Sequence, residues 1–168
     1  MTGPPQIDPA LVRAAQRGDR IAVADLMDAL APYVGQVCGA IALHDGPDAA
    51  QEALIAILTN LAGLREPGAI YGWARAIAVR EAVRVARKAA RAVPAELADI
   101  PAPDDPQLAA DIRDVLARLT PEHRAVLVLR DLEGLDEQAA GALLNVPPAT
   151  VRTRLFRARR SFRKAWSR

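Results

Sequence analysis

Residues 135–166 read LDEQAAGALLNVPPATVRTRLFRARRSFRKAW, and their pattern predicts two helices joined by a sharp turn. The first helix is expected over residues 136–144, with acidic side chains at its positively polarised start. Asn145 tolerates the left-handed backbone with which many helices end. Pro147 and Pro148 cannot continue the first helix, but they suit the opening of a second one. The stretch therefore predicts a helix-turn-helix unit.

The second helix of this unit is expected to separate apolar from basic side chains. At roughly 100° per residue, one stripe collects the apolar residues Val151, Leu155, Ala158 and Phe162. The opposite side collects Ala149, Thr153, Phe156, Arg157 and Arg160, with Arg152 and Arg159 on one flank and Arg154 on the other. Because the stripe needs a core to cover it, the opposite side is predicted to face solvent or a ligand. Guanidinium forks match phosphates and guanine edges, so DNA is the predicted ligand.

Charge is distributed unevenly along the chain. Residues 149–168 contain eight Lys/Arg and no acid, whereas residues 92–148 contain four Arg and eleven Asp/Glu. The net charge of +2 therefore conceals a strongly basic C-terminus. A solvated, Arg-rich terminal helix would have the same composition. The turn and the separation of faces favour a helix-turn-helix that reads DNA instead.

The composition of the 168-residue chain predicts an all-α fold without a membrane partner. The chain is 51% hydrophobic but only 4% aromatic, so its cores must be built from Ala, Leu, Val and Ile, which favours helices over sheets. It contains no unbroken apolar run of roughly eighteen residues, the length that spans a membrane. Residues 1–9 lack the basic start and the apolar run of a signal peptide. These features predict a cytoplasmic protein.

Residues that could carry out chemistry are sparse. Cys38 is the single cysteine, which excludes an internal disulfide and a cysteine-based metal cluster. It lies in an apolar stretch and is predicted to be a buried small hydrophobe, with a redox-sensing thiol as the alternative. The sequence has no nucleophile–base pair, no phosphate-binding Gly loop and no carboxylate cluster with metal-ligand spacing. We therefore expect no enzymatic activity, no cofactor and no metal site.

Helical periodicity predicts four helices before residue 93, over residues 9–17, 20–42, 47–61 and 70–92. The buried face of the third is expected to hold Ala50, Ala53, Leu54, Ile57, Leu58 and Leu61. Its opposite face carries Asp48, Gln51, Glu52 and Ile55. The fourth is basic, with Arg75, Arg80, Arg84, Arg87, Lys88 and Arg91 against the single acid Glu81. Basic side chains at this spacing track backbone phosphates.

A Pro-rich segment divides the chain. Residues 93–107, VPAELADIPAPDDPQ, contain four Pro and four acids in fifteen positions, which predicts a flexible acidic linker. Two helices are expected after it, over residues 108–119 and 121–132, the second capped by Thr120. The predicted fold is therefore two small helical domains, residues 8–92 and 108–166, of which the second ends in the helix-turn-helix.

Residues 119–160, LTPEHRAVLVLRDLEGLDEQAAGALLNVPPATVRTRLFRARR, resemble the fourth conserved region of extracytoplasmic-function (ECF) sigma factors, in the sigma-70 family. In that family this region is a helical domain whose helix-turn-helix binds the upstream, minus-thirty-five promoter element. The D-x-x-Q-E formed by Asp48, Gln51 and Glu52 resembles the family's second conserved region, which docks on the clamp helices of the polymerase's largest subunit. The basic helix over residues 70–92 resembles the segment that recognises and melts the downstream, minus-ten element.

The resemblance implies a set of site residues and partners. The DNA-binding residues would be Ala149, Thr150, Arg152, Thr153, Phe156, Arg157 and Arg160 in the second domain and Arg80, Arg84 and Arg87 in the first. The polymerase-binding residues would be Asp48, Gln51, Glu52 and Ile55. The implied partners are core RNA polymerase and promoter DNA, with an anti-sigma factor as a further candidate.

The first domain departs from the family's pattern at several positions. Arg80 stands where the family usually has Asn, and Arg84 stands where it often has Asp. The loop over residues 65–69 contains no aromatic side chain on which an unpaired base could stack. These departures leave three interpretations of the first domain open: a changed base preference, weak strand opening, or a docking role with little melting activity.

The predicted function is that of a sigma factor, which directs RNA polymerase to specific promoters for transcription initiation and does no chemistry itself. Two alternatives stay open. A stand-alone helix-turn-helix regulator would bind a palindromic duplex without polymerase. A sigma-like protein-interaction module would occupy polymerase or an anti-sigma factor without opening DNA.

Overall fold

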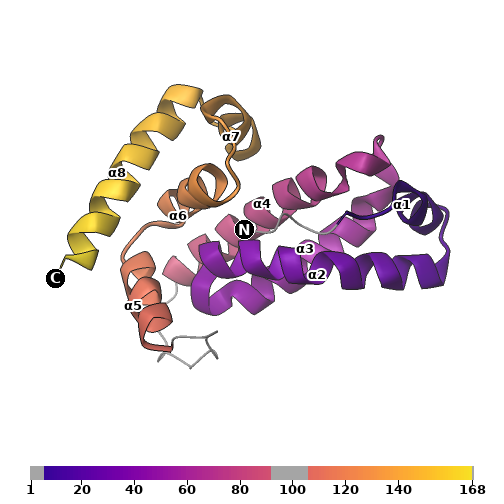
Figure 1. Cartoon of the computed structure of the whole chain (residues 1–168), viewed down its shortest axis with the longest axis horizontal. Coiled ribbons are helices and arrows are strands. Elements are labelled where there is room, and N and C mark those ends of the chain that lie inside the picture. The colour runs from indigo at the N-terminus through magenta and orange to yellow at the C-terminus, as the bar shows by residue number, and fades with distance from the viewer. Residues whose placement is uncertain (1–5, 92–105, 168) are drawn as a thin grey trace.

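The computed structural model describes residues 6–91 and 106–167, and every regular element within those two ranges is helical. The predicted all-α class is confirmed. Figure 1 shows two groups of helices: α1–α4 form a bundle, and α5–α8 form a second group in which α8 contacts the other three and α6 lies against the bundle. Residues 6–91 are called the first half and residues 106–167 the second half.

The first half is a bundle of four helices. They are α1 (Pro9–Gln16), α2 (Arg20–Ala42), α3 (Gly46–Asn60) and α4 (Ile70–Arg91). Aspartates cap the first two: Asp8 Oδ1 accepts a hydrogen bond from the Ala10 N–H at 2.8 Å, and Asp19 Oδ1 accepts one from the Ile21 N–H at 3.0 Å. Pro32 lies inside α2, which continues through it without a break.

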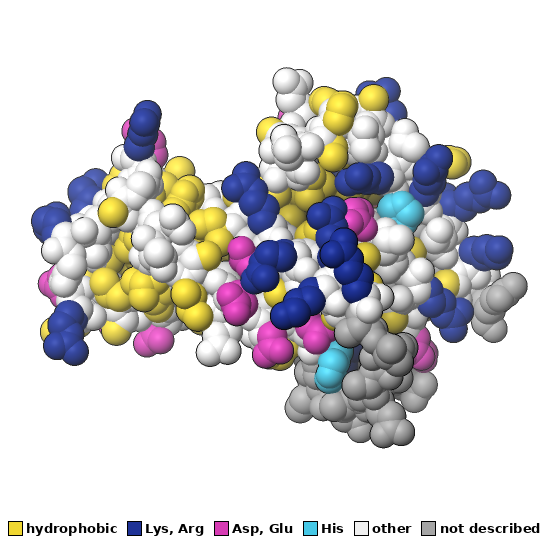
Figure 2. Space-filling model, turned by 180° about the vertical axis from the view of Figure 1, so that it is seen from behind, with side chains coloured by type: hydrophobic (Ala, Val, Ile, Leu, Met, Phe, Trp, Pro, Cys, Tyr) yellow, Lys and Arg dark blue, Asp and Glu magenta, His cyan; other side chains and the backbone are white. Residues whose placement is uncertain are grey.

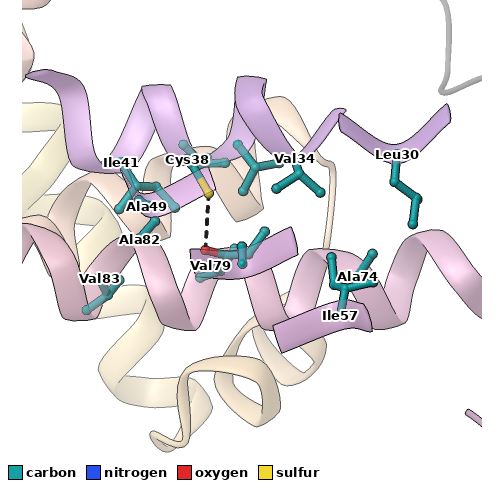
Figure 3. Close-up of a cluster of buried hydrophobic side chains, with 14 of the residues drawn as sticks. Leu30, Val34, Cys38, Ile41, Ala49, Ile57, Ala74, Val79, Ala82 and Val83 are labelled. Atoms are coloured by element: carbon teal, nitrogen blue, oxygen red, sulfur yellow. Dashed lines mark hydrogen bonds between the residues drawn. The ribbon is translucent and has the colours of Figure 1, made fainter. Parts of the chain in front are cut away.

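The core of the first half is built from short aliphatic side chains, as the composition requires. Leu30, Val34 and Cys38 point from α2 toward the other helices, where they meet Ile57 of α3 and Val79 of α4 (Figure 3). All five side chains are fully buried. The Cys38 thiol donates to the Ala78 carbonyl at 3.6 Å, and burial raises its pKa to about 12. Cys38 is therefore the buried hydrophobe that the sequence predicts.

One stretch of the described chain, Arg20–Gly63, is long and apolar enough to cross a membrane, by length and composition alone. Its most apolar window has a mean hydropathy of 1.4, although no unbroken apolar run is present. In this structure 39% of that window is buried, and the stretch comprises α2 and α3, which pack against each other and against α4. The core helix of a soluble protein passes the same test, so the stretch is a weak indication of a membrane span.

The second half contains α5 (Pro106–Ala117), α6 (Pro121–Leu127), the π-helical turn η4 (Val128–Leu132), α7 (Glu137–Leu144) and α8 (Pro148–Trp166). Thr120 caps α6, since its hydroxyl accepts from the His123 N–H at 3.2 Å. Asn145 ends α7 in the left-handed conformation, with φ 55° and ψ 46°. The predicted linker, residues 93–107, falls outside the described residues except for its last two positions, which open α5.

The turn between α7 and α8 brings the two helices into close contact at Gly141. A Cβ added there would lie 2.7 Å from the Val146 carbonyl oxygen and 3.5 Å from Val151 Cγ2. The Val146 N–H also donates to the Gly141 carbonyl at 2.9 Å, so the backbone cannot easily retreat. Only a glycine fits at this position of the helix-turn-helix.

We expect Gly141→Ala to lower the free energy of unfolding by about 1–3 kcal/mol, because the added methyl group overpacks the turn. Gly35→Ala is the matched control. A Cβ at Gly35 would meet nothing within 4 Å, so this change within α2 should raise stability by about 0.5–1 kcal/mol. Urea unfolding of the two variants measures both effects. Equal stabilities would show that the α7–α8 contact is looser than described here.

The two halves share a hydrophobic core, which the local sequence pattern does not predict. α6 packs against α2 and α4 of the first half as well as against α8. Its buried side chains Ala125 and Val126, with Leu129 of η4, belong to the same cluster as the core of the first half. The halves are thus in contact through α6 rather than held only by the chain that joins them.

Buried Arg124 is the main polar link between the halves. Its side chain is 7% exposed and has no carboxylate partner among the described residues. Its Nε donates to the Ile41 carbonyl at 2.5 Å, near the C-terminal end of α2. Its Nη1 donates to the carbonyls of Leu119 at 2.6 Å and Leu116 at 3.2 Å, at the end of α5. Helix C-termini have unpaired carbonyls and carry partial negative charge. One guanidinium therefore stabilises the C-terminal ends of two helices, α2 and α5.

Glu133, just after η4, makes a second polar link. Its Oε2 accepts from the Tyr33 hydroxyl at 2.8 Å and from Arg75 Nη1 at 3.1 Å. Burial, followed by the hydrogen bond and the charge of Glu133, raises the pKa of Tyr33, so the phenol stays neutral and donates. A carboxylate of the second half is therefore held by side chains from α2 and α4.

Candidate nucleic-acid interface

The α8 helix presents two distinct faces. Val151, Leu155 and Ala158 are buried against the second half, as the stripe predicts. Phe162, the fourth member of the predicted stripe, is only half-buried. The predicted DNA-binding side chains Ala149, Arg152, Thr153, Phe156, Arg157 and Arg160 are exposed, and Thr150 is half-buried. Phe156 is 62% exposed, an unusual position for a phenyl ring on a soluble surface.

Acidic residues of the second half pair with two arginines on one flank of α8. Arg152 pairs with Glu137 at the start of α7, with Nη2–Oε2 at 2.7 Å and Nε 3.1 Å from both carboxylate oxygens. Arg159 pairs with Asp131 of η4. These hydrogen bonds raise the pKa of both guanidinium groups. Arg157 and Arg160, by contrast, have no ion-pair partner within the part of the chain that the structure describes.

The α4 helix supplies a second basic surface. Arg80, Arg84 and Arg87, the predicted DNA-binding residues of the first half, are all exposed on it. Arg84 Nη2 lies 2.7 Å from Glu81 and 3.6 Å from Glu52, and Arg87 Nε lies 2.5 Å from Oε1 of Glu122. Two of the three guanidinium groups are thus already paired with carboxylates.

A groove of about 600 Å³, called the interhalf groove, brings this basic surface against the second half. It is lined by Val79, Arg80, Val83, Arg84, Arg87, Lys88 and Arg91 of α4 and by Glu122, Leu143, Leu144, Asn145 and Arg154 of the second half. Figure 2 shows Lys and Arg side chains gathered across the middle of the face opposite to that of Figure 1, with acidic side chains beside them. The predicted α4 site and the turn of the helix-turn-helix therefore face the same groove.

The third helix carries the predicted polymerase-binding residues on one exposed face. Asp48, Gln51, Glu52 and Ile55 all point away from the core. The prediction that Leu58 is buried is wrong, because this side chain is 45% exposed and lies near Ile55, itself 55% exposed. Ala49 is fully buried in its place. Because α3 contacts both α2 and α4, its buried face includes Ala49 and leaves out Leu58, unlike the face expected from helical periodicity.

Comparisons with known proteins agree with this geometry. The family described as Sigma-70, region 4 matches residues 109–162. The RNA polymerase sigma-H factor of Pseudomonas aeruginosa is 32% identical over 182 residues, which cover 94% of this chain and 93% of that protein. The chain belongs to the ECF sigma factors of the sigma-70 family. ECF sigma factors direct RNA polymerase to promoters for transcription initiation, and they are initiation factors rather than enzymes.

Two further relatives bear ECF names. The ECF RNA polymerase sigma factor SigE of Mycolicibacterium smegmatis is 34% identical over 132 residues, 71% of this chain. The chain spans about half the length of that relative, 51%. The ECF RNA polymerase sigma-E factor of Escherichia coli K12 is 29% identical over 175 residues, 90% of each chain.

Two solved structures share the fold of this ECF sigma factor. CnrH, solved in complex with the cytosolic domain of CnrY, matches with a TM-score of 0.64 and 21% identity over 94% of this chain and 95% of that one. The sigma factor RpoE, solved with the anti-sigma factor NepR from Bartonella quintana, matches with a TM-score of 0.66 and 17% identity over 85% and 97% of the two chains.

The structure also holds an apolar groove that sequence reasoning missed. It has a volume of about 420 Å³ and is lined by Ala40, Ile112, Leu116, Arg124, Leu127, Val128, Asp131, Leu132, Arg159, Phe162 and Arg163. Leu132 is 52% exposed and Ile112 is 36% exposed. The periodicity of residues 108–119 identifies Ile112 as apolar-facing, but it could not show that the facing side chains leave a groove. In the sigma factor this surface lies between α5, α6 and the C-terminal half of α8.

Proposed function

We propose that this ECF sigma factor reads the upstream promoter element with the exposed face of α8 and contacts the downstream element with α4. The observation that carries the proposal is the orientation of α8. Its apolar stripe is buried, and Arg157 and Arg160 project from the opposite side beside an exposed Phe156. Guanidinium groups and an aromatic edge on one helix face suit phosphates, guanine edges and thymine methyl groups. The proposed DNA-binding units are residues 8–92 and 108–166.

Contact with both promoter elements requires the halves to separate. The positions that give the minus-ten and minus-thirty-five elements their names differ by about 25 base pairs. That separation is on the order of 80 Å along B-form DNA, at about 3.4 Å per base pair. In the structure α4 and α8 contribute to one groove, and Arg87 is paired with Glu122 of the opposite half. We therefore propose that the described arrangement is a closed form and that binding to polymerase holds the halves apart.

Docking on core RNA polymerase is proposed for the exposed face of α3. This face combines the carboxylates of Asp48 and Glu52 with the apolar side chains of Ile55 and Leu58. A small apolar centre with a charged rim is typical of protein interfaces, and acidic groups there would complement a basic partner surface.

We expect Glu52→Lys to weaken the capture of purified core polymerase by about tenfold or more, because a like charge would then face the basic partner surface. The Glu52 side chain is 56% exposed and its contact with Arg84 is long, at 3.6 Å, so helicity by circular dichroism should be retained. Asp28→Lys, the same charge reversal at an exposed position of α2, is the control and should bind normally. Capture of the Glu52 variant at the wild-type level would show that the polymerase-binding surface does not include this face of α3.

Run-off transcription with purified core polymerase and genomic DNA tests the function as a whole. We expect promoter-specific transcripts that depend on the added chain. A stand-alone regulator would instead bind a palindromic duplex tightly without polymerase. A protein-interaction module would bind polymerase but form no open complexes; the absence of an aromatic side chain from residues 65–69 is the feature that favours this alternative.

An anti-sigma factor is proposed as a further partner. The apolar groove leaves Leu132 and Ile112 exposed next to the charged side chains of Asp131 and Arg159. An amphipathic helix would cover such a surface. The similar RpoE structure holds an anti-sigma factor, which supports the same kind of partner here. Because its proposed partners are polymerase and DNA, we also propose that the chain acts in the cytoplasm and catalyses no reaction.

A further inference from the structure

The interhalf groove is an electropositive site built by both halves of the molecule. Six of its lining residues are cationic: Arg80, Arg84, Arg87, Lys88 and Arg91 on α4 and Arg154 on α8. Glu122 is the single acidic residue among those that line the groove. Such an excess of one charge within a groove concentrates counter-ions of the opposite sign.

Most of these cations are free to bind a ligand. Arg84 is paired with Glu81 and Glu52, and Arg87 is paired with Glu122. The remaining four, Arg80, Lys88, Arg91 and Arg154, have no hydrogen bond or ion pair within residues 6–91 and 106–167. None of these four side chains is held in place by a carboxylate at salt-bridge distance within those residues.

The opposite wall shows the effect of this charge on its neighbours. Burial and then the charge of Arg154 lower the pKa of His123. The pKa of Glu122 is also lowered: burial acts to raise it, but the hydrogen bond from Arg87, a main-chain hydrogen bond and the charges of Arg87 and Arg154 outweigh that effect. The positive charge of Arg154 therefore adds to that of the α4 cations in the groove, from the wall formed by the second half.

The spacing of the cations indicates the shape of the ligand. Positions 80 and 91 are eleven steps apart along α4, or about 16 Å at about 1.5 Å per step. A single phosphate would meet one or two of these side chains, whereas a linear chain of phosphates would meet several. Arginine forks and lysine ammonium groups are the side chains that proteins use for such anions.

We propose that the interhalf groove binds a linear oligophosphate, which bridges the α4 cations to Arg154 across the groove. The ligand is either a free inorganic polyphosphate or the polyphosphate tail of a nucleotide. Because it contacts both walls, it stabilises the closed form by mass action and opposes separation of the halves. This consequence for opening rests on the proposed function, whereas binding itself does not.

The test is calorimetric titration of the full chain at about 0.15 M salt, where screening beyond about 8 Å suppresses diffuse attraction. The ligands are tripolyphosphate, a nucleoside triphosphate and orthophosphate. We expect one tripolyphosphate per chain, bound at least about tenfold more tightly than orthophosphate. Tighter binding of the nucleoside triphosphate than of tripolyphosphate identifies a nucleotide as the ligand, and the reverse order identifies a free polyphosphate. Equal affinity for orthophosphate and tripolyphosphate would overturn the proposal.

Two single variants and a control place the ligand. Arg154→Ala and Lys88→Ala, on opposite walls, should each weaken tripolyphosphate binding by about fivefold or more. Arg163→Ala removes an exposed arginine of α8 outside this groove and should change the affinity less than twofold. If Arg163→Ala has the same effect as Arg154→Ala, the attraction is diffuse and the site does not exist. If oligothymidine binds in an Arg154-dependent manner and tripolyphosphate does not, the groove binds nucleic acid and the proposal is wrong.

A second measurement separates this proposal from the proposed function. Tripolyphosphate should reduce the capture of core polymerase by the wild-type chain but not by the Arg154→Ala variant. If the wild type with bound tripolyphosphate captured polymerase as well as the free chain does, the proposal that the ligand opposes separation of the halves would be wrong. The calorimetric experiment needs neither polymerase nor DNA, so its outcome is independent of whether the chain initiates transcription.

Discussion

Replacement of Arg124 by alanine should lower the free energy of unfolding by about 3–5 kcal/mol. The side chain is 7% exposed and donates to three main-chain carbonyls, those of Ile41, Leu116 and Leu119. Its removal would leave these acceptors inside the protein without donors, and hydrogen bonds to a charged group are stronger than neutral ones. Urea unfolding followed by circular dichroism measures the loss.

Two variants sharpen this test. Arg118→Ala removes an exposed arginine just before α6 and should change stability by less than about 0.5 kcal/mol. Arg124→Lys keeps the charge but has no fork with which to reach both helix ends, so an intermediate loss is expected. A loss below about 1 kcal/mol for Arg124→Ala would mean that water replaces the guanidinium, and that the halves are less tightly joined than the structure shows.

The double variant Arg157→Ala/Arg160→Ala should bind the upstream promoter element about 10- to 100-fold more weakly than the wild type. Each guanidinium that contacts a guanine edge contributes about 1–3 kcal/mol of discrimination, and each that contacts a phosphate adds about 1 to the salt slope. Fluorescence anisotropy of a labelled duplex with the polymerase-bound protein, at several salt concentrations, distinguishes the two kinds of contact.

The fold should survive this double change, because both side chains are exposed and lack ion pairs within the described residues. Arg17→Ala, at the exposed end of α1, is the control for a general loss of positive charge. Leu155→Ala is the opposite case: it removes a buried side chain and should lower stability by about 2–5 kcal/mol. DNA affinity unchanged in the double variant would show that another face of α8 meets the promoter.

Features determined by neighbouring residues could be predicted from the sequence. The caps at Asp8 and Thr120 and the left-handed Asn145 all follow from local backbone chemistry, and the structure has each of them. The faces of α8 could be predicted for the same reason, since a helix of regular period must turn its basic and apolar residues in opposite directions. DNA binding by those faces stays a prediction.

Features that depend on tertiary contacts could not be predicted in the same way. Nothing in the local pattern around Arg124 shows that its acceptors lie in α2 and α5, because one of them is 83 residues away. The exposure of Leu58 depends on the angle at which α3 meets its two neighbours. The π-helical turn η4 breaks the regular period over Val128–Leu132, where one continuous helix was expected. The residues of the linker, apart from its last two, lie outside the described chain.

The core shared through α6 gives separation of the two halves a free-energy cost. When the halves part, the faces of Ala125, Val126 and Leu129 that now touch the first half meet water, at about 25 cal/mol for each Å² of apolar surface. The exposed face of α8 needs no such parting. Simultaneous contact of α4 and α8 with separated elements does need it, so its free-energy cost falls on the partner that holds the halves apart.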